Sequence, residues 1–259
     1  MLERLAKSPL LLGAAFLLSA LLGAGLYAGI QAAVPGANPD KAKIEAVVRA
    51  YILEHGEILP EAMDKLQARQ LAERQKALGE APKYIAAHKA QIVDPYAGAT
   101  QGNPKGDVTV AAYLDYNCGY CRASLPAIAE LVKRDPNVRI VYREYPVLAE
   151  ESVTAARWAL AAAEQGKFLA YHTAVYAGGR TDEASLEQAA AGAGVDLAKA
   201  KTAANSTRVS QEIKKNLDTA AALGTSGATP FWVVGNQVIS GLVDYERLAA
   251  AVAAARAGK

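Results

Sequence analysis

The chain has 259 residues, and 52% of them are hydrophobic, so it can bury a sizeable core and is not an intrinsically disordered protein. Its net charge is +2, with acidic and basic residues mixed along the sequence, which gives no electrostatic case for a nucleic-acid partner. It has two cysteines, close together in sequence, which excludes a disulfide-rich scaffold. Much of the apolar fraction is alanine, a strong helix former, so the composition predicts a helix-rich α/β protein.

The first apolar segment, residues 9–33, predicts a transmembrane anchor or a signal segment, because it is uncharged and a membrane-spanning helix needs about 20 residues. Arg4 and Lys7 precede it, so the positive-inside rule places residues 1–8 in the cytoplasm and exports the remainder. The alternative is a cleaved signal peptide, but the apolar run is long for one and no clean cleavage site follows it. Both interpretations place the rest of the chain outside the cytoplasm, where disulfides persist.

Residues 41–92 predict a helical N-terminal region. Apolar residues recur there at helical spacing, including Val47, Tyr51, Leu59, Met63 and Leu66. The region has too few large apolar side chains to form a core alone, so its apolar stripe must pack against another surface. We expect a homo-oligomer formed through 41–89; the alternative is that the stripe packs on the chain's own C-terminal domain.

Residues 93–259 predict an α/β domain, with the polar stretch 94–106 as its boundary. The pattern predicts a strand over 107–116, a helix over 122–134, a strand over 138–142, a helical block over 150–223, a hairpin over 231–239 and a closing helix over 244–255. The two cysteines therefore lie between the first strand and the first helix of this domain.

Cys118 and Cys121 predict a redox-active pair. Thiolate is the reactive form of cysteine, and a cysteine at the start of a helix is favoured as thiolate by the unpaired backbone N–H groups there. Cys121, one turn further on, is placed to attack a mixed disulfide formed on Cys118 and release the substrate. Gly119 is expected to permit the tight turn, and Tyr120 to offer substrates an aromatic surface beside the sulfurs.

Other interpretations of the pair are weaker. A zinc site normally needs four ligands, and only His55, His88 and His172 remain, without a second pair at ligand spacing. A purely structural bridge would close so short a loop that it would constrain little. An envelope protein that binds Cu(I) through the two thiols is the alternative function, although only two soft ligands are present. We expect no cofactor and no resident metal.

Thr229 and Pro230 precede the strand that starts at Phe231. A cis Thr229–Pro230 bond would turn the Thr229 backbone toward the sulfurs, where it could pair with an extended substrate peptide. X–Pro bonds are cis in only about 5–6% of cases, so the residues alone favour trans. The candidate substrate-binding residues are thus Gly119, Tyr120, Thr229 and Pro230.

The C-terminal domain resembles the DsbA-like branch of the thioredoxin superfamily. The resemblance lies in Gly102–Thr109 (GNPKGDVT), Asp115–Cys121 (DYNCGYC), Arg143–Leu148 (REYPVL) and Ala228–Phe231 (ATPF), in that order. It implies a thioredoxin-like fold over 93–259 with a helical insertion at about 149–223, and a cis Pro230. It also implies exported cysteine-containing proteins as substrates and a membrane redox partner that resets the cysteine pair.

The helices of 41–89 are similar to the N-terminal region of ScsC-type proteins, periplasmic DsbA relatives linked to copper tolerance. In that group the region can drive oligomerisation, and some members isomerise disulfides. One departure concerns Ala112, which stands where DsbA relatives commonly carry a buried acid beneath the cysteines. Asp115 and Glu144 are candidates to compensate, although an ordinary hydrogen-bonded role is favoured for Asp115.

The fold expected is therefore thioredoxin-like α/β with a helical insertion, preceded by an N-terminal membrane helix and a helical oligomerisation segment. The function expected is periplasmic thiol–disulfide exchange on exported proteins through Cys118 and Cys121. The direction of exchange depends on the reduction potential of the pair, so oxidant, isomerase and reductase remain open.

Overall fold

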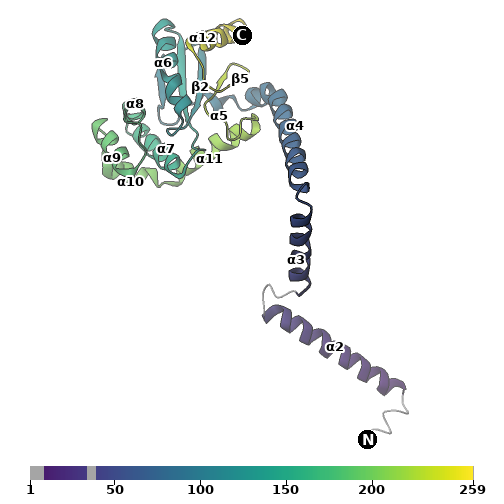
Figure 1. Cartoon of the computed structure of the whole chain (residues 1–259). Helices are drawn as coiled ribbons and strands as arrows, with labels where there is room; N and C mark the ends of the chain where they lie inside the picture. The colour runs from purple at the N-terminus through teal and green to yellow at the C-terminus, as the bar shows by residue number, and fades with distance from the viewer. Residues whose placement is uncertain (1–8, 34–38, 259) are drawn as a thin grey trace. The chain divides into compact units, whose positions relative to one another are not determined.

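A computed structural model describes residues 9–33 and 39–258 (Figure 1). The chain divides into two compact units, Met1–Ala68 and Arg69–Lys259. Helix α2 (Pro9–Ala33) occupies the range predicted for the anchor or signal segment, whereas the predicted cytoplasmic residues 1–8 lie outside the described residues. Within the described ranges, no helix is long and apolar enough to cross a membrane. The membrane helix therefore stays a prediction.

The first unit also contains α3 (Pro39–Glu54) and the beginning of α4 (Ile58–Ala87). The predicted apolar stripe lies on these two helices, and its side chains are exposed by 41–68%: Val47, Tyr51, Leu59, Met63 and Leu66. Exposed apolar side chains in a continuous stripe can be removed from water only by packing against a partner surface.

A five-stranded sheet forms the centre of the second unit, in the order β1-β3-β2-β4-β5. Its strands are β1 (Thr100–Gly102), β2 (Val108–Leu114), β3 (Val138–Glu144), β4 (Phe231–Val234) and β5 (Gln237–Ser240). Strands β2 and β3 run parallel, while β1, β4 and β5 are antiparallel to their neighbours. The β-branched and aromatic residues of β2 and β3 explain why these central strands form.

Strand β1 lies within 94–106, the polar stretch that the sequence analysis gave as the domain boundary, and was not predicted. Thr100 and Gly102 pair with Val141 and Arg139 on β3. Three residues at a sheet edge carry too little apolar periodicity to be recognised, because backbone pairing rather than side-chain burial holds them.

Helices cover both faces of the sheet (Figure 1). Helices α6 (Gly119–Arg134) and α12 (Tyr245–Ala257) pack on the face to which Ala112 and Leu114 point. The end of α4, with α5 (Lys89–Val93) and α11 (Thr207–Ala222), covers the face of Ala111 and Tyr113. Side chains alternate between the faces because successive residues of a strand point in opposite directions.

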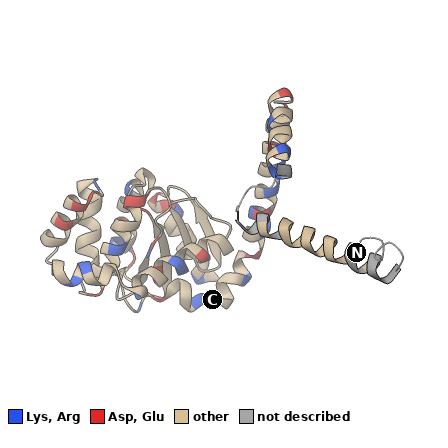
Figure 2. Ribbon diagram, turned by 90° about the horizontal axis from the view of Figure 1, so that it is seen from below, with Lys and Arg blue, Asp and Glu red and all other residues tan. Residues whose placement is uncertain are grey.

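The predicted helical block is divided into five helices: α7 (Glu150–Ala163), α8 (Phe168–Gly178), α9 (Glu183–Gly192), α10 (Leu197–Ala204) and α11. Asp182, Asp196 and Ser206 accept N-cap hydrogen bonds at the starts of α9, α10 and α11. Acidic and basic residues are mixed over the second unit, and α2 carries no charge (Figure 2).

Candidate active site

The cysteine pair lies where β2 passes into α6. Cys118 is the N-cap residue of α6, and its sulfur accepts a hydrogen bond from the backbone N of Cys121 at 3.4 Å. The helix predicted from Arg122 already begins at Gly119, so both cysteines belong to its first turn. The positive end of the helix dipole therefore faces the Cys118 sulfur.

The two cysteines differ in depth and in acidity. Cys118 is 6% exposed at the edge of a groove, whereas Cys121 is fully buried, and both are thiols. A hydrogen bond from the Cys121 side chain, aided by backbone N–H groups of Cys121 and Tyr120, lowers the pKa of Cys118 to about 6. Burial, followed by the hydrogen bond to Cys118, raises the pKa of Cys121. At neutral pH the outer cysteine is thus the thiolate and the inner one the thiol.

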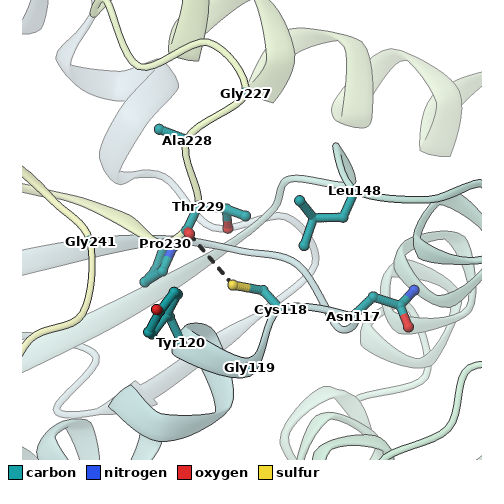
Figure 3. Close-up of a pocket in the computed structure, with 10 residues that line it drawn as sticks. All are labelled: Asn117, Cys118, Gly119, Tyr120, Leu148, Gly227, Ala228, Thr229, Pro230 and Gly241. Atoms are coloured by element: carbon teal, nitrogen blue, oxygen red, sulfur yellow. Dashed lines mark hydrogen bonds between the residues drawn. The ribbon is translucent and has the colours of Figure 1, made fainter.

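Thr229 faces both sulfurs from the loop before β4. The Cys118 thiol donates to the carbonyl O of Thr229 at 3.5 Å (Figure 3), and Cys121 Sγ lies 3.2 Å from Thr229 Oγ1. The Thr229–Pro230 peptide bond is cis, as the family resemblance implied and contrary to the base rate. Residues more than a hundred positions apart thus meet at one place.

A groove of about 380 Å³ opens beside Cys118, lined by the loops around Tyr120, Leu148, Gly227 and Pro230. Tyr120 is 66% exposed and Leu148 50%, and they lie on opposite sides of Cys118 in the view of Figure 3. This apolar rim suits an extended or unfolded peptide. Gly119 is the first residue of α6, lines the groove, and has open space where a Cβ would lie.

The Asp115 carboxylate accepts four hydrogen bonds next to the cysteine loop. One oxygen accepts from the backbone N of Asn117 at 2.8 Å and from Ser152 Oγ at 2.7 Å. The other accepts from the backbone N of Val147 at 2.8 Å and of Leu148 at 3.0 Å. These four hydrogen bonds tie the cysteine loop to the segment between β3 and α7, the hydrogen-bonded role that the sequence analysis favoured.

A buried polar cluster lies under the cysteine loop. Glu144, at the end of β3, is 3% exposed, and its Oε1 lies 3.3 Å from the hydroxyl of Tyr116. The same hydroxyl lies 3.0 Å from Nδ1 of His172, which is also buried. Burial raises the pKa of Glu144 and lowers that of His172 to about 3. The sequence analysis proposed Glu144 but missed Tyr116, and treated His172 only as an unsuitable zinc ligand.

Within residues 9–33 and 39–258, no group of three or more His, Cys, Asp or Glu side chains is arranged to hold a metal ion.

A family described as Thioredoxin matches residues 96–254 of the chain. The chain belongs to the thioredoxin family. Residues 40–73 match a second family, described as the copper resistance protein ScsC N-terminal domain, which confirms the resemblance noted for this region.

Solved structures of thioredoxin-like proteins are similar to the chain. A thioredoxin-like oxidoreductase from Silicibacter pomeroyi is 37% identical with a TM-score of 0.62, over 65% of this chain and 98% of that one. Proteus mirabilis ScsC in a transitional conformation is 24% identical with a TM-score of 0.62, over 88% and 100%, a likeness that shows the fold. The thiol-disulfide exchange protein α-DsbA2 of Wolbachia pipientis is 26% identical with a TM-score of 0.59, over 72% and 97%.

The curated relatives are larger proteins. The Na⁺/H⁺ antiporter NhaA 1 of Salinispora arenicola is 32% identical over 64% of this chain, and NhaA 3 of Salinispora tropica is 33% identical over 63%. The chain spans about a quarter of their length, 26% and 25%. The chain is therefore similar to only part of each antiporter.

Proposed function

We propose that the chain is a thiol–disulfide oxidoreductase that exchanges disulfides with exported proteins on the periplasmic side of the inner membrane. The observation that carries the proposal is the pairing of an acidic Cys118 at a groove with a fully buried Cys121 behind it. The likeness to an oxidoreductase and to a thiol-disulfide exchange protein supports it.

In the proposed reaction, the Cys118 thiolate attacks one sulfur of a substrate disulfide and forms a mixed disulfide, while the other substrate sulfur leaves as a thiolate and takes a proton from solvent. Cys121 then loses its proton and attacks Cys118, which releases the second substrate sulfur and leaves the enzyme oxidised. In the reverse direction, the same two steps oxidise a substrate dithiol to a disulfide. Two electrons move between the same four sulfurs in either direction, so no further oxidant takes part.

Thr229 supports the binding of substrate in this scheme. Its carbonyl accepts from the Cys118 thiol, and that hydrogen bond is lost when Cys118 ionises. The freed carbonyl is then available to a backbone N–H of an extended substrate peptide beside the reacting sulfur. Tyr120 and Pro230 line the same groove and supply apolar contact.

The acidity of Cys118 bears on the direction of exchange. A thiolate stabilised in the reduced protein makes the disulfide easier to reduce, which favours oxidant or isomerase over reductase. We propose isomerase activity, because a homo-oligomer formed through the exposed stripe of 41–89 would present several Cys118 sites around one substrate. The similarity of residues 40–73 to the ScsC N-terminal domain supports this.

Light scattering tests the oligomer. The chain from Asp40 onward is compared with the same chain lacking residues up to Ala68, the end of the first unit, and with a Val47→Glu, Tyr51→Glu variant that places charges in the stripe. An oligomer that dissociates in both altered proteins is expected. A monomer in the unaltered protein would remove the main reason for preferring isomerase.

Export and redox resetting complete the proposal. The uncharged segment 9–33 either anchors the protein or is cleaved as a signal, and disulfides persist in the oxidising compartments outside the cytoplasm. A membrane redox partner would return the Cys118–Cys121 pair to its working state after each net transfer of electrons.

Two substitutions test the chemistry. Cys118→Ser is expected to abolish exchange on a disulfide-containing protein substrate, because no outer thiolate remains. Cys121→Ser is expected to trap mixed disulfides on Cys118, visible on a non-reducing gel. If activity survives Cys118→Ser and Cys121→Ser traps no mixed disulfide, the roles proposed here for the two cysteines are wrong.

Copper handling remains the second candidate, because the family matched by residues 40–73 is described by copper resistance. The two thiols are soft ligands that suit Cu(I). Titration of the reduced protein with Cu(I) against a competing chelator tests it, with Cys118→Ser as control. Tight binding that disappears in the variant, together with absent disulfide exchange, would favour this function.

A further inference from the structure

A second cavity lies at the end of the sheet that is remote from the cysteines. It measures about 700 Å³ and is enclosed by the end of α4, α5, the first residues of β2, the β4–β5 hairpin and the end of α12. Strand β2 begins at Val108, and Cys118 follows its other end. Because seven residues of strand span about 20 Å, this cavity is separate from the groove beside Cys118. Cavities of this size hold small organic molecules.

Arg139 lines the cavity with a guanidinium group that is held in one orientation. Its Nε and Nη2 donate to Thr109 Oγ1 at 3.1 and 2.9 Å, and Nη2 also donates to the carbonyl O of Val93 at 3.2 Å. Arg139 and Thr109 are partners in the parallel register of β2 and β3, so their side chains lie on the same face of the sheet. The planar group is therefore already oriented for an anion, and a carboxylate matches its geometry.

A second arginine on the same face of β3 shows what Arg139 lacks. Arg143 is 1% exposed, donates to three backbone carbonyls at and beside α5, and pairs with the Glu212 carboxylate at 2.8 Å. Arg139 is half-buried, and it forms no ion pair with any other residue that the structure describes. A charge that is partly removed from water is stabilised by an anionic partner. A ligand carboxylate would therefore give Arg139 the partner that Glu212 gives Arg143.

The other charged side chains around the cavity also favour an anion. Lys89 is exposed at the cavity and, within residues 9–33 and 39–258, it has no carboxylate partner. Asp107 lines the cavity too, but its two carboxylate oxygens accept from Nε and Nη2 of Arg256, each at 2.8 Å. The charges left for a ligand are therefore the two positive ones of Arg139 and Lys89.

Apolar side chains from four elements line the same cavity: Ile85, Ile92, Val93, Val108 and Val233. The matching ligand thus has one negatively charged end and an apolar body. Inorganic phosphate or sulfate would satisfy the two cations but leave this apolar lining uncovered. An organic acid with a single carboxylate satisfies both parts of the cavity.

We propose that this cavity is a binding site for a small organic carboxylate. Arg139 and Lys89 hold the carboxylate, and the apolar body of the ligand lies against Ile92 and Val233. The site adds to the proposed disulfide exchange and does not depend on it, because the cavity and the cysteines lie at opposite ends of β2.

A nuclear magnetic resonance titration of the isotope-labelled full chain tests the site, with octanoate as the probe. Octanol, which lacks the charge, and acetate, which lacks the apolar body, are the matched controls. Octanoate should shift the backbone amide signals of Thr109, Arg139 and Asn236 until they saturate, and neither control should do so at the same concentration. The absence of saturable shifts at these residues, or equal shifts with octanol, would overturn the proposal.

Two substitutions in the cavity test the role of charge. Arg139→Met should weaken octanoate binding by about 10–100-fold, which corresponds to the loss of a hydrogen bond to a charged group. Lys89→Glu changes an exposed side chain and covers the case in which Arg139→Met does not fold; it should weaken binding by about 10-fold, because an anion replaces a cation beside the carboxylate.

Lys133→Glu is the matched control, because Lys133 is an exposed lysine on α6 that does not line the cavity. It should leave the affinity for octanoate unchanged. Wild-type affinity in Lys89→Glu or in folded Arg139→Met would overturn the proposal. Equal weakening in Lys89→Glu and Lys133→Glu would also overturn it, since net charge alone would then explain the effect.

Discussion

Replacing Cys121 by alanine is expected to raise the pKa of Cys118. The hydrogen bond from the Cys121 side chain is the largest cause of the fall from 9.0 to about 6, and burial opposes it. Backbone N–H groups of Cys121 and Tyr120 also contribute, and these remain in the variant. The variant therefore separates the contribution of the Cys121 thiol to the pKa of Cys118 from that of the backbone N–H groups at the start of α6.

The magnitude follows from the size of a charge-assisted hydrogen bond. The full fall in pKa corresponds to about 4 kcal/mol between thiolate and thiol, at about 1.4 kcal/mol for each pKa unit. A hydrogen bond to a charged group is worth about 1.5–3 kcal/mol, and a thiol is a weak donor, so its loss should raise the pKa by about one unit. Cys118 should then titrate near 7 in Cys121→Ala, and close to its original value in Cys121→Ser, which retains a donor.

The assay follows thiolate absorbance in the ultraviolet, and independently the rate of alkylation by iodoacetamide, across the pH range. Cys118→Ser gives the background signal. An unchanged titration in Cys121→Ala would show that the backbone of α6 alone stabilises the thiolate. A rise as large in Cys121→Ser as in Cys121→Ala would refute the role assigned to the side-chain donor.

Three further results are expected. Because the pKa of Cys118 is lowered in the fold, its ionisation stabilises the reduced protein fully above the unfolded pKa near 9.0, and this stabilisation is lost as the pH falls through about 6. In urea denaturation, the free energy of unfolding of the reduced wild type should therefore fall by about 1–3 kcal/mol relative to Cys118→Ser between pH 8 and pH 5, after allowance for solvent screening. Arg143→Met should lower the free energy of unfolding by about 3–5 kcal/mol, because Glu212 keeps only Lys215 as a partner and the carbonyls of Gln91, Ile92 and Asp94 lose their donor; Arg143→Met, Glu212→Leu should recover part of it. Protease added to spheroplasts should digest residues after Asp40, and a protected chain would contradict the exported topology.

The sequence predicted the elements that carry strong local signals. Strands β2 and β3, the hairpin at Gly235 and the closing helix α12 fall close to their predicted ranges. The position of the cysteine pair between a strand and a helix also followed from pattern alone. These features depend on neighbours in sequence, where apolar periodicity and turn residues are readable.

The buried cluster could not be predicted, because its members are distant in sequence. Glu144 and Tyr116 are 28 positions apart, and Tyr116 and His172 are 56 apart. The parallel register of β2 and β3 supplies the first contact, and the packing of α8 supplies the second. His172 offered one signal, since it stands among the aromatic residues Phe168, Tyr171 and Tyr176 at helical spacing, which places it on the buried face of α8.

Depth within one helical turn explains how a single site makes two cysteines chemically opposite. Cys118 reaches the groove and the N–H groups of the helix start, which stabilise its negative charge. Cys121 faces the sheet, where burial disfavours the same charge. In the proposed exchange, that difference makes Cys118 the nucleophile, and every opening of the disulfide leaves a charge on Cys121, the sulfur that burial disfavours as a thiolate.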